Sequence, residues 1–167
     1  SLNGVVTKKA IKVAGDVMDH DIQNWFRNNH RLEIGDRTAE QIKIAVGSAM
    51  RSRSKNILVK GRDLVSGIPK TIDVRSDEIR QALKDSVKRI LEVVKDALES
   101  TPPELSSDII DRGILVAGGG AQLRGLDQVI REKTNVPCNV VEEPHLAIVK
   151  GCGKIIEDLE KYKHVLI

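Results

Sequence analysis

Several residues and patterns that mark common functional classes are scarce in this 167-residue sequence. Aromatic residues make up only 2% of it, and cysteine occurs only at Cys138 and Cys152. The two cysteines have neither C-x-x-C spacing nor a nearby histidine at ligand spacing, so we expect reduced thiols and no zinc site. No apolar run approaches the length of a transmembrane helix. These absences argue against a disulfide scaffold, a zinc module and a membrane-spanning protein.

An excess of one charge is also missing. The formal net charge is only +3, and lysine and arginine alternate with aspartate and glutamate along the chain. The one basic cluster, MRSRSKN at 50–56, has no aromatic residue that could stack on a base. We therefore expect this cluster to be a solvated loop and expect no nucleic acid partner.

The first residues predict a β-hairpin that is cut short. Asn3 and Gly4 form a two-residue turn of the type that joins hairpin strands, with one strand ending at Leu2 and the other running through Val13. A native strand of one or two residues is implausible. We therefore expect the chain to be a fragment or an excised domain.

The rest of the sequence alternates helical and strand patterns. Apolar residues at helical spacing follow Gly15, with Asp16 as the expected N-cap of a helix that ends near Asn29. Thr38 and Gln41 form a capping-box pair at the expected start of a second helix, which continues to residue 50. With the segments that follow, this alternation predicts an α/β fold.

A hairpin and a long helix are expected next. Residues 55–63 and 70–75 are the expected strands of the hairpin, and residues 64–69 join them. Ser76 is the expected cap of a long helix, which the prolines of 101–103 end before another short helix starts. The remaining expected elements are a buried strand at 113–120, a helix at 126–133, a short strand at 137–142 and a helix with two glycines at 145–166.

Three consecutive glycines, Gly118, Gly119 and Gly120, follow the expected buried strand in ILVAGGGAQLRG. Glycine lets the backbone approach a ligand closely, so this run suggests a bare surface for a flat or charged group. A tight turn is the alternative, although one or two glycines would suffice for it. The stretch is not a dinucleotide fingerprint, since Leu123 stands where a third glycine is needed, and it is not a Walker loop, which would need lysine where Leu126 stands.

Six segments in order cover essentially the whole chain: IKVAGDVMD, LEIGDRTAEQIKIAVGSA, VKGRDLVSGIPKTI, STPPEL, DIIDRGILVAGGGAQLRGLD and VVEEPHLAIVKGCGKIIEDL. Together they resemble the C-terminal part of the MreB family of bacterial actin homologues. The resemblance implies one half of a two-half actin-like ATPase. It places a ribonuclease-H-like subdomain at 1–14 and 84–167 and an inserted small α/β subdomain at 15–83.

The resemblance also implies a nucleotide site. In this family ATP or ADP with Mg²⁺ lies between the halves, and the phosphates and metal are held mainly by residues that precede Ser1. It assigns Glu40 and Lys43 to the adenosine and the loop from Gly118 to Ala121 to the surface on which the nucleotide rests. The full set of expected nucleotide-binding residues is Gly15, Asp16, Glu40, Gln41, Ile42, Lys43, Gly118, Gly119, Gly120 and Ala121.

Local spacing alone gives these residues simpler roles. Glu40 and Lys43, three apart on a helix, would form a surface ion pair contributing about 0.2–0.5 kcal/mol. Asp16 would be only a helix cap. The resemblance assigns no catalytic or metal-binding residue to this chain. We therefore expect the chain alone to be inactive as an ATPase and to hold no nucleotide stably.

At the level of the whole protein, the resemblance implies ATP-dependent polymerisation into filaments at the inner face of the cell membrane, which control rod shape and cell-wall synthesis. The expected partners are further copies of the protein, the missing N-terminal half and membrane-anchored cell-shape proteins. Two alternatives stay open. The chain could be a docking module for a membrane-anchored cytoskeletal partner, or half of an Hsp70-like or sugar-kinase-like ATPase, although the long match from RTAEQIK to GGGAQLRGLD argues against the latter.

Overall fold

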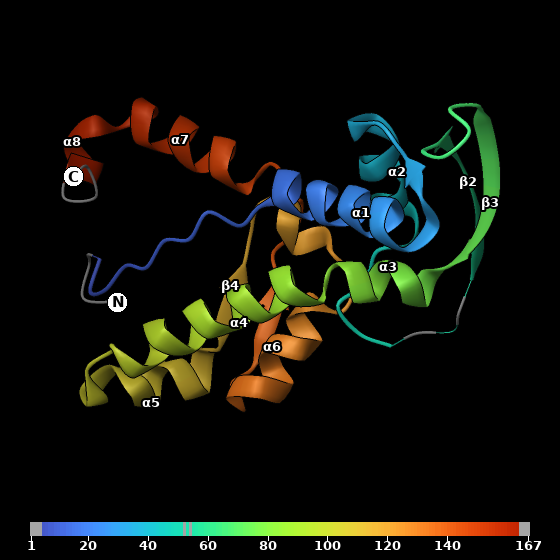
Figure 1. Cartoon of the computed structure of the whole chain (residues 1–167). Helices are drawn as coiled ribbons and strands as arrows, with labels where there is room; N and C mark the ends of the chain where they lie inside the picture. The colour runs from blue at the N-terminus through green and yellow to red at the C-terminus, as the bar shows by residue number, and fades with distance from the viewer. Residues whose placement is uncertain (1–4, 52, 54, 164–167) are drawn as a thin grey trace. The chain divides into compact units, whose positions relative to one another are not determined.

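The computed structural model describes residues 5–51, 53 and 55–163, and Figure 1 labels their helices and strands. The chain divides into two compact units. The hairpin unit comprises residues 12–90 and 123–126, and the glycine-loop unit comprises residues 1–11, 91–122 and 127–167. The subdomain boundaries that the resemblance implies, after residues 14 and 83, stay a prediction.

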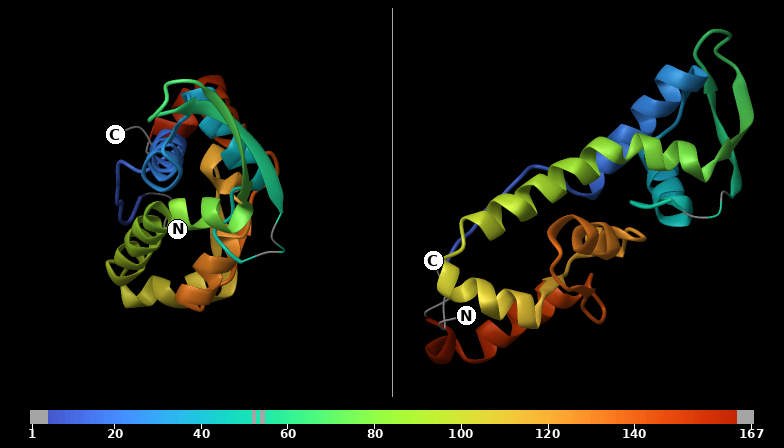
Figure 2. Two further views of the ribbon diagram at one scale, coloured as in Figure 1. Left: turned by 45° about the vertical axis from the view of Figure 1, so that its right-hand side comes forward. Right: turned by 90° about the horizontal axis from the view of Figure 1, so that it is seen from below.

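The hairpin unit is built on a three-stranded antiparallel sheet in the order β1-β2-β3. Its elements are α1 (Gly15–His30), β1 (Leu32–Glu33), α2 (Asp36–Val46), β2 (Asn56–Asp63), β3 (Pro69–Arg75), α3 (Ser76–Ala82) and the first part of α4 (Lys84–Glu99). Strands β2 and β3 pair from Asn56↔Arg75 to Arg62↔Pro69. Figures 1 and 2 show them as a long curved ribbon. The hairpin predicted from the alternating pattern is confirmed.

The core of the hairpin unit lies where α1 packs against α2, β1 and α3. Met18, Ile22 and Phe26 recur every four residues, so they share one face of α1, and each is at most 2% exposed. Fully burying a side chain of this size stabilises the fold by about 1.5–3 kcal/mol. The other elements contribute the buried residues Leu32, Ala39, Ile42, Val46, Val59, Val74, Ile79 and Leu83.

Two helix starts differ from the prediction. Helix α1 begins at Gly15 with Ala14 as its N-cap, so Asp16 lies in the first turn and does not cap the helix. Helix α2 begins at Asp36, and no side chain caps it. The Thr38 capping box is therefore wrong, because the Thr38 amide already donates to the Gly35 carbonyl inside the helix, at 3.0 Å.

The end of α2 and the start of α3 also differ from the positions expected from the sequence. Helix α2 ends at Val46, four residues before the expected end, because the residues after it turn so that Ser48 pairs with Arg124. Ser76 is the first residue of α3, and its hydroxyl accepts from the Lys55 amide at 3.0 Å. The long helix expected from Ser76 is divided at Leu83 into α3 and α4.

The glycine-loop unit contains a parallel two-stranded sheet and several helices. Its elements, after the end of α4, are α5 (Pro103–Arg112), β4 (Ile114–Val116), a short 3-10 helix (Gly119–Gln122), α6 (Leu126–Thr134), β5 (Cys138–Val140), α7 (Ala147–Glu157) and α8 (Leu159–Tyr162). The predicted break between α4 and α5 at the prolines is confirmed, as are helix α6 and strand β5.

Three expectations for this unit need correction. The strand expected to be buried is short, and Leu115 in it is 70% exposed, since β4 pairs only with β5 among the described residues. The last helix breaks at Asp158, whose carboxylate accepts from the Lys161 amide at the start of α8. Residues 5–13 belong to no strand, because no described strand pairs with them. The turn at Asn3 and Gly4 and the end of the last expected helix, 164–166, lie outside the described residues.

Candidate functional site

The glycine loop after β4 is fixed at both ends. Gly118 has φ +89°, a conformation that favours glycine. Its amide donates to the Pro144 carbonyl at 2.7 Å, and its carbonyl accepts from the amide of Ala121 at 3.1 Å. Ala121 is buried. The loop therefore has a defined backbone path, with Gly118 as the residue that its geometry requires.

The next two glycines are not explained by packing. A Cβ built on Gly119 or Gly120 would meet no atom of the described structure within 4 Å. Both residues are exposed at the start of the 3-10 helix. The turn therefore needs only Gly118, and the space over the next two residues is free for a flat ligand to lie against the backbone. A nucleotide contact by this loop, which the resemblance implies, stays a prediction.

On α2, in the hairpin unit, Glu40 and Lys43 have different environments. Glu40 is exposed, whereas the Lys43 side chain is only 16% exposed. The Lys43 ammonium donates to Oδ2 of Asp19 at 2.8 Å and to the Gly15 carbonyl at 3.1 Å. Within the described residues there is no ion pair between Glu40 and Lys43. The surface pair suggested by spacing alone is therefore wrong, and the Glu40 carboxylate is available to a ligand.

Gly15 and Asp16 lie in the first turn of α1. Gly15 contacts Lys43, because a Cβ on Gly15 would come within 3.1 Å of the ammonium nitrogen. Asp16 is exposed beside it. The structure thus brings Gly15 and Lys43 together. For Asp16 a contact with nucleotide stays a prediction.

Gln41 and Ile42 face another side of α2. Both line a groove between α2 and β2, together with Thr38, Ala45 and residues 57–60. Helical spacing places these α2 positions away from the face that carries Glu40 and Lys43. Ile42 is also part of the core. A nucleotide contact by these two residues stays a prediction.

The position of α2 is set at its C-terminal end by Arg124. The Arg124 guanidinium donates to the carbonyls of Ile44, at 3.5 Å, and Ala45. The Arg124 carbonyl accepts from the Ala49 amide at 2.9 Å and from the Ser48 hydroxyl at 3.2 Å. A cation at a helix C-terminus satisfies carbonyls that have no partner within the helix. These contacts fix the helix that carries Glu40 and Lys43.

Asp19 is the residue of this site that the sequence analysis missed. It lies next to Met18 and four residues after Gly15, on the face of α1 that packs on α2. A charged residue on an apolar helix face is a signal for a buried partner of opposite charge. That signal does not identify the partner, because Lys43 is 24 residues further along the chain.

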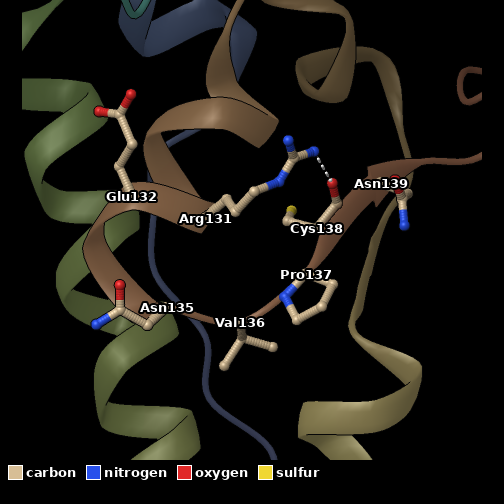
Figure 3. Close-up of a pocket in the computed structure, with 7 residues that line it drawn as sticks. All are labelled: Arg131, Glu132, Asn135, Val136, Pro137, Cys138 and Asn139. Carbon is tan, nitrogen blue, oxygen red and sulfur yellow. Dashed lines mark hydrogen bonds between the residues drawn. The ribbon is translucent and has the colours of Figure 1, made fainter.

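A second hollow lies in the glycine-loop unit, where α6 leads into β5 (Figure 3). The Arg131 guanidinium reaches β5 and donates to the Cys138 carbonyl at 2.9 Å, whereas Glu132 points away. Burial raises the pKa of the Cys138 thiol, and the charge of Asp127 raises it further. A neutral, buried thiol is a poor nucleophile. The polar groups here hold α6 to β5 and do not form a reactive centre.

Metal ligands and membrane-spanning segments are not found in the part of the chain that the structure describes. No group of three or more histidine, cysteine, aspartate or glutamate side chains there is arranged to hold a metal ion. No helix among those residues combines the length and apolar character needed to cross a bilayer.

Comparisons with known proteins give close relatives. The chain is 46% identical over 162 residues to "Cell shape-determining protein Mbl" of Bacillus subtilis (strain 168), covering 96% of this chain and 49% of the relative. It is 41% identical over 163 residues to "Cell shape-determining protein MreB" of Escherichia coli (strain K12), covering 97% and 47%. The chain therefore spans about half the length of the curated relatives that it matches.

Solved structures agree in fold. The structure matches MreB5 of Spiroplasma citri bound to ADP with a TM-score of 0.88 and 34% identity, covering 93% of this chain and 48% of that one. It also matches a MamK double helical filament with a TM-score of 0.75 at 23% identity, which supports the fold alone. These are actin-like proteins, and the α/β class expected from the sequence is confirmed. A model of the MreB/Mbl protein family matches residues 1–164, and the chain therefore belongs to the MreB/Mbl family.

Proposed function

We propose that this chain supplies the nucleoside side of an ATP site in an actin-like cytoskeletal protein that controls cell shape. The relatives at 41–46% identity are named cell shape-determining proteins. MreB5 of Spiroplasma citri, at 34% identity, was solved with ADP and also with AMPPNP. The membership of the chain in the MreB/Mbl family excludes the Hsp70-like and sugar-kinase-like alternative.

The observation that carries the proposal is the open backbone at Gly119 and Gly120. No atom of the described residues fills the space that a side chain there would take. Packing against the described residues therefore leaves the space over both glycines open, so a nucleotide can lie against the backbone. The fixed turn at Gly118 holds this surface in place.

The residues have separate roles toward the nucleotide. The exposed Glu40 carboxylate accepts hydrogen bonds from sugar hydroxyls, and the aliphatic part of Lys43 packs against the purine. The backbone from Gly118 to Ala121 gives the nucleotide a surface on which to rest. Mg²⁺ would supply charge stabilisation for phosphoryl transfer, and residues of the N-terminal half of the full-length protein would mainly hold it.

Glycine substitutions test the open surface directly. In the full-length protein, Gly119→Ala and Gly120→Ala should leave the melting temperature unchanged, because the added methyl groups meet no protein atom. The affinity for ATP, measured by calorimetric titration, should fall about tenfold, which corresponds to about 1.4 kcal/mol of binding free energy.

Gly153→Ala is the matched control. Gly153 lies on α7 in the same unit and also has nothing within 4 Å of its added Cβ. The control should bind ATP as the parent does. Unchanged ATP affinity in both loop variants would contradict the proposed nucleotide surface.

The same proposal covers assembly and location. Nucleotide binding biases polymerisation with further copies of the protein, and the filaments act at the inner face of the cell membrane with membrane-anchored cell-shape proteins, where they guide wall synthesis. Electron microscopy of the full-length protein should show filaments whose formation depends on ATP. A protein that binds ATP but gives only monomers under all nucleotide conditions would contradict this part.

A further inference from the structure

An ion pair between two helices of the hairpin unit holds the only lysine of the candidate site. Oδ2 of Asp19 lies 2.8 Å from the Lys43 ammonium, and the side chains are only 14% and 16% exposed. Oδ1 of Asp19 is buried and has no hydrogen-bond partner among the described residues. Lys43 is thus the one partner of the Asp19 carboxylate among the described residues, and because a buried carboxylate without a partner is costly, the pair holds both side chains in place.

Gly15 makes room for this contact. Its carbonyl accepts a second hydrogen bond from the ammonium, at 3.1 Å. A Cβ at this position would also lie 3.1 Å from the ammonium nitrogen, closer than such atoms normally approach. A side chain at residue 15 would therefore require the Lys43 ammonium to shift by a few tenths of an ångström. Asp19 and Gly15 together form a cradle for the ammonium, and we call it the lysine cradle.

We propose that Asp19 is a positioning residue of the nucleotide site, which fixes the Lys43 side chain before nucleotide binds. The inference rests on the proposed function of Lys43 and deepens it. Lysine has a long side chain whose free rotation is costly to restrict, so ordering it in advance lowers the free energy that binding must supply. Asp19 acts through Lys43 and does not touch the ligand.

The lysine cradle also changes how the two candidate residues divide their roles. The Lys43 ammonium is held at α1 by Asp19 and Gly15, so Glu40 is not needed to hold it. Lys43 therefore presents its aliphatic part to the nucleoside, while Glu40 keeps both oxygens for hydroxyl groups. This division predicts that Asp19 is energetically coupled to Lys43 and independent of Glu40.

A double-mutant cycle in the full-length protein tests the coupling. The variants are Asp19→Asn, Lys43→Met and both together, each titrated calorimetrically with ATP and melted without it. Asp19→Asn should weaken ATP binding by about three- to tenfold, a modest loss of preorganisation. Adding Asp19→Asn to Lys43→Met should cause no further loss. In the double variant of Asp19→Asn and Glu40→Gln, by contrast, the fold-losses in ATP affinity of the two single variants should multiply.

Two further variants separate positioning from stability. Gly15→Ala keeps every charge and should keep the melting temperature, because alanine favours the helix more than glycine does. It should still weaken ATP binding by about two- to fivefold, because the ammonium is displaced. Glu78→Gln is the control, since Glu78 on α3 pairs with His30 of helix α1 at 2.7 Å and the two side chains are 30% and 25% exposed. It should leave ATP affinity unchanged.

The outcomes distinguish the inference from the function on which it rests. If Lys43→Met and Glu40→Gln weaken ATP binding but Asp19→Asn and Gly15→Ala do not, Asp19 is only structural and the inference is wrong. If the losses from Asp19→Asn and Lys43→Met multiply, the coupling is absent and the inference is also wrong. Methionine keeps an aliphatic side chain, so Lys43→Ala tests the nucleoside contact: if Lys43→Ala and Glu40→Gln both bind ATP as the parent does, that proposed contact itself fails.

Discussion

The Lys43 ammonium on α2 donates a hydrogen bond to Oδ2 of Asp19 on α1 at 2.8 Å, while Glu40, one turn earlier on α2, is exposed. Two residues that spacing alone would join as a surface pair therefore have different surroundings. Lys43 belongs to the contact between two helices, and Glu40 belongs to the surface. Substitutions at the two positions should therefore differ in how much they lower the stability of the fold.

The first prediction compares the stability of two variants. Lys43→Ala should lower the free energy of unfolding by about 1–3 kcal/mol, because it leaves the Asp19 carboxylate largely buried without its partner. Glu40→Gln should change it by less than about 0.5 kcal/mol, as expected for an exposed site. Chemical denaturation in the absence of nucleotide measures both values. Equal losses in the two variants would contradict the asymmetry.

The second prediction concerns the two thiols. Burial raises the pKa of Cys138, whereas Cys152 is exposed on α7. Because the thiolate is the reactive form, Cys152 should react with iodoacetamide at pH 8 at least about tenfold faster than Cys138. The rates, followed by mass spectrometry of digested samples, should become similar in denaturant. Faster labelling of Cys138 in the folded protein would contradict this.

The third prediction follows from the turn of the β2–β3 hairpin. The pKa of Asp63 lies well below its usual range, first because the Ser66 amide donates to it and then because of the Lys70 ammonium and the Val65 amide. A carboxylate with a lowered folded-state pKa stabilises the fold above its unfolded pKa, near 3.9, and this contribution is lost as the pH falls through the lower, folded-state pKa.

Amide exchange of Val65 and Ser66 should therefore show protection at pH 5 that weakens as the pH falls below about 4. Asp63→Asn should weaken the protection at pH 5 and remove most of its pH dependence. Nuclear magnetic resonance measures the exchange residue by residue. Identical exchange of these two amides in parent and variant across this range would contradict the role of Asp63.

The sequence predicted the elements with the most regular patterns. The β2–β3 hairpin, the break at the prolines and helix α6 depend on local alternation, on proline chemistry and on helical spacing, which one segment contains in full. The helix starts at Asp16 and Thr38 were wrong, because the backbone before each helix begins it without a side-chain cap. The local sequence pattern does not show whether a side chain or only the backbone begins the helix.

The site was predictable only in part for a similar reason. The glycine run is visible in the sequence, and its need for open space follows from the chemistry of glycine. The partner of Lys43 depends on how α1 and α2 pack, and that packing involves residues 24 positions apart. The exposure of Leu115 likewise depends on which strands surround β4. Such tertiary contacts cannot be predicted from the residue spacing within one segment.

The fourth prediction concerns the isolated chain. Leu115 on β4 and Ile148, Val149 and Ile156 on α7 are each more than 60% exposed. Exposed apolar side chains and a strand edge favour association with other copies. The chain alone should show concentration-dependent self-association in sedimentation velocity, without ordered filaments in electron micrographs. A strict monomer at high concentration, or regular filaments, would contradict it.

The most direct test of the account is the ATP affinity of Glu40→Gln in the full-length protein, measured by calorimetric titration beside Asp85→Asn. Glu40 and Asp85 are both exposed acidic residues on helices of the hairpin unit, so each substitution removes the same charge from the same kind of surface. We expect Glu40→Gln to weaken ATP binding by about 1–2 kcal/mol, the order of one hydrogen bond to a charged group, with the melting temperature unchanged. Asp85→Asn should bind as the parent does. Equal ATP affinity in Glu40→Gln and the parent would contradict the claim that this chain supplies the nucleoside side of the site.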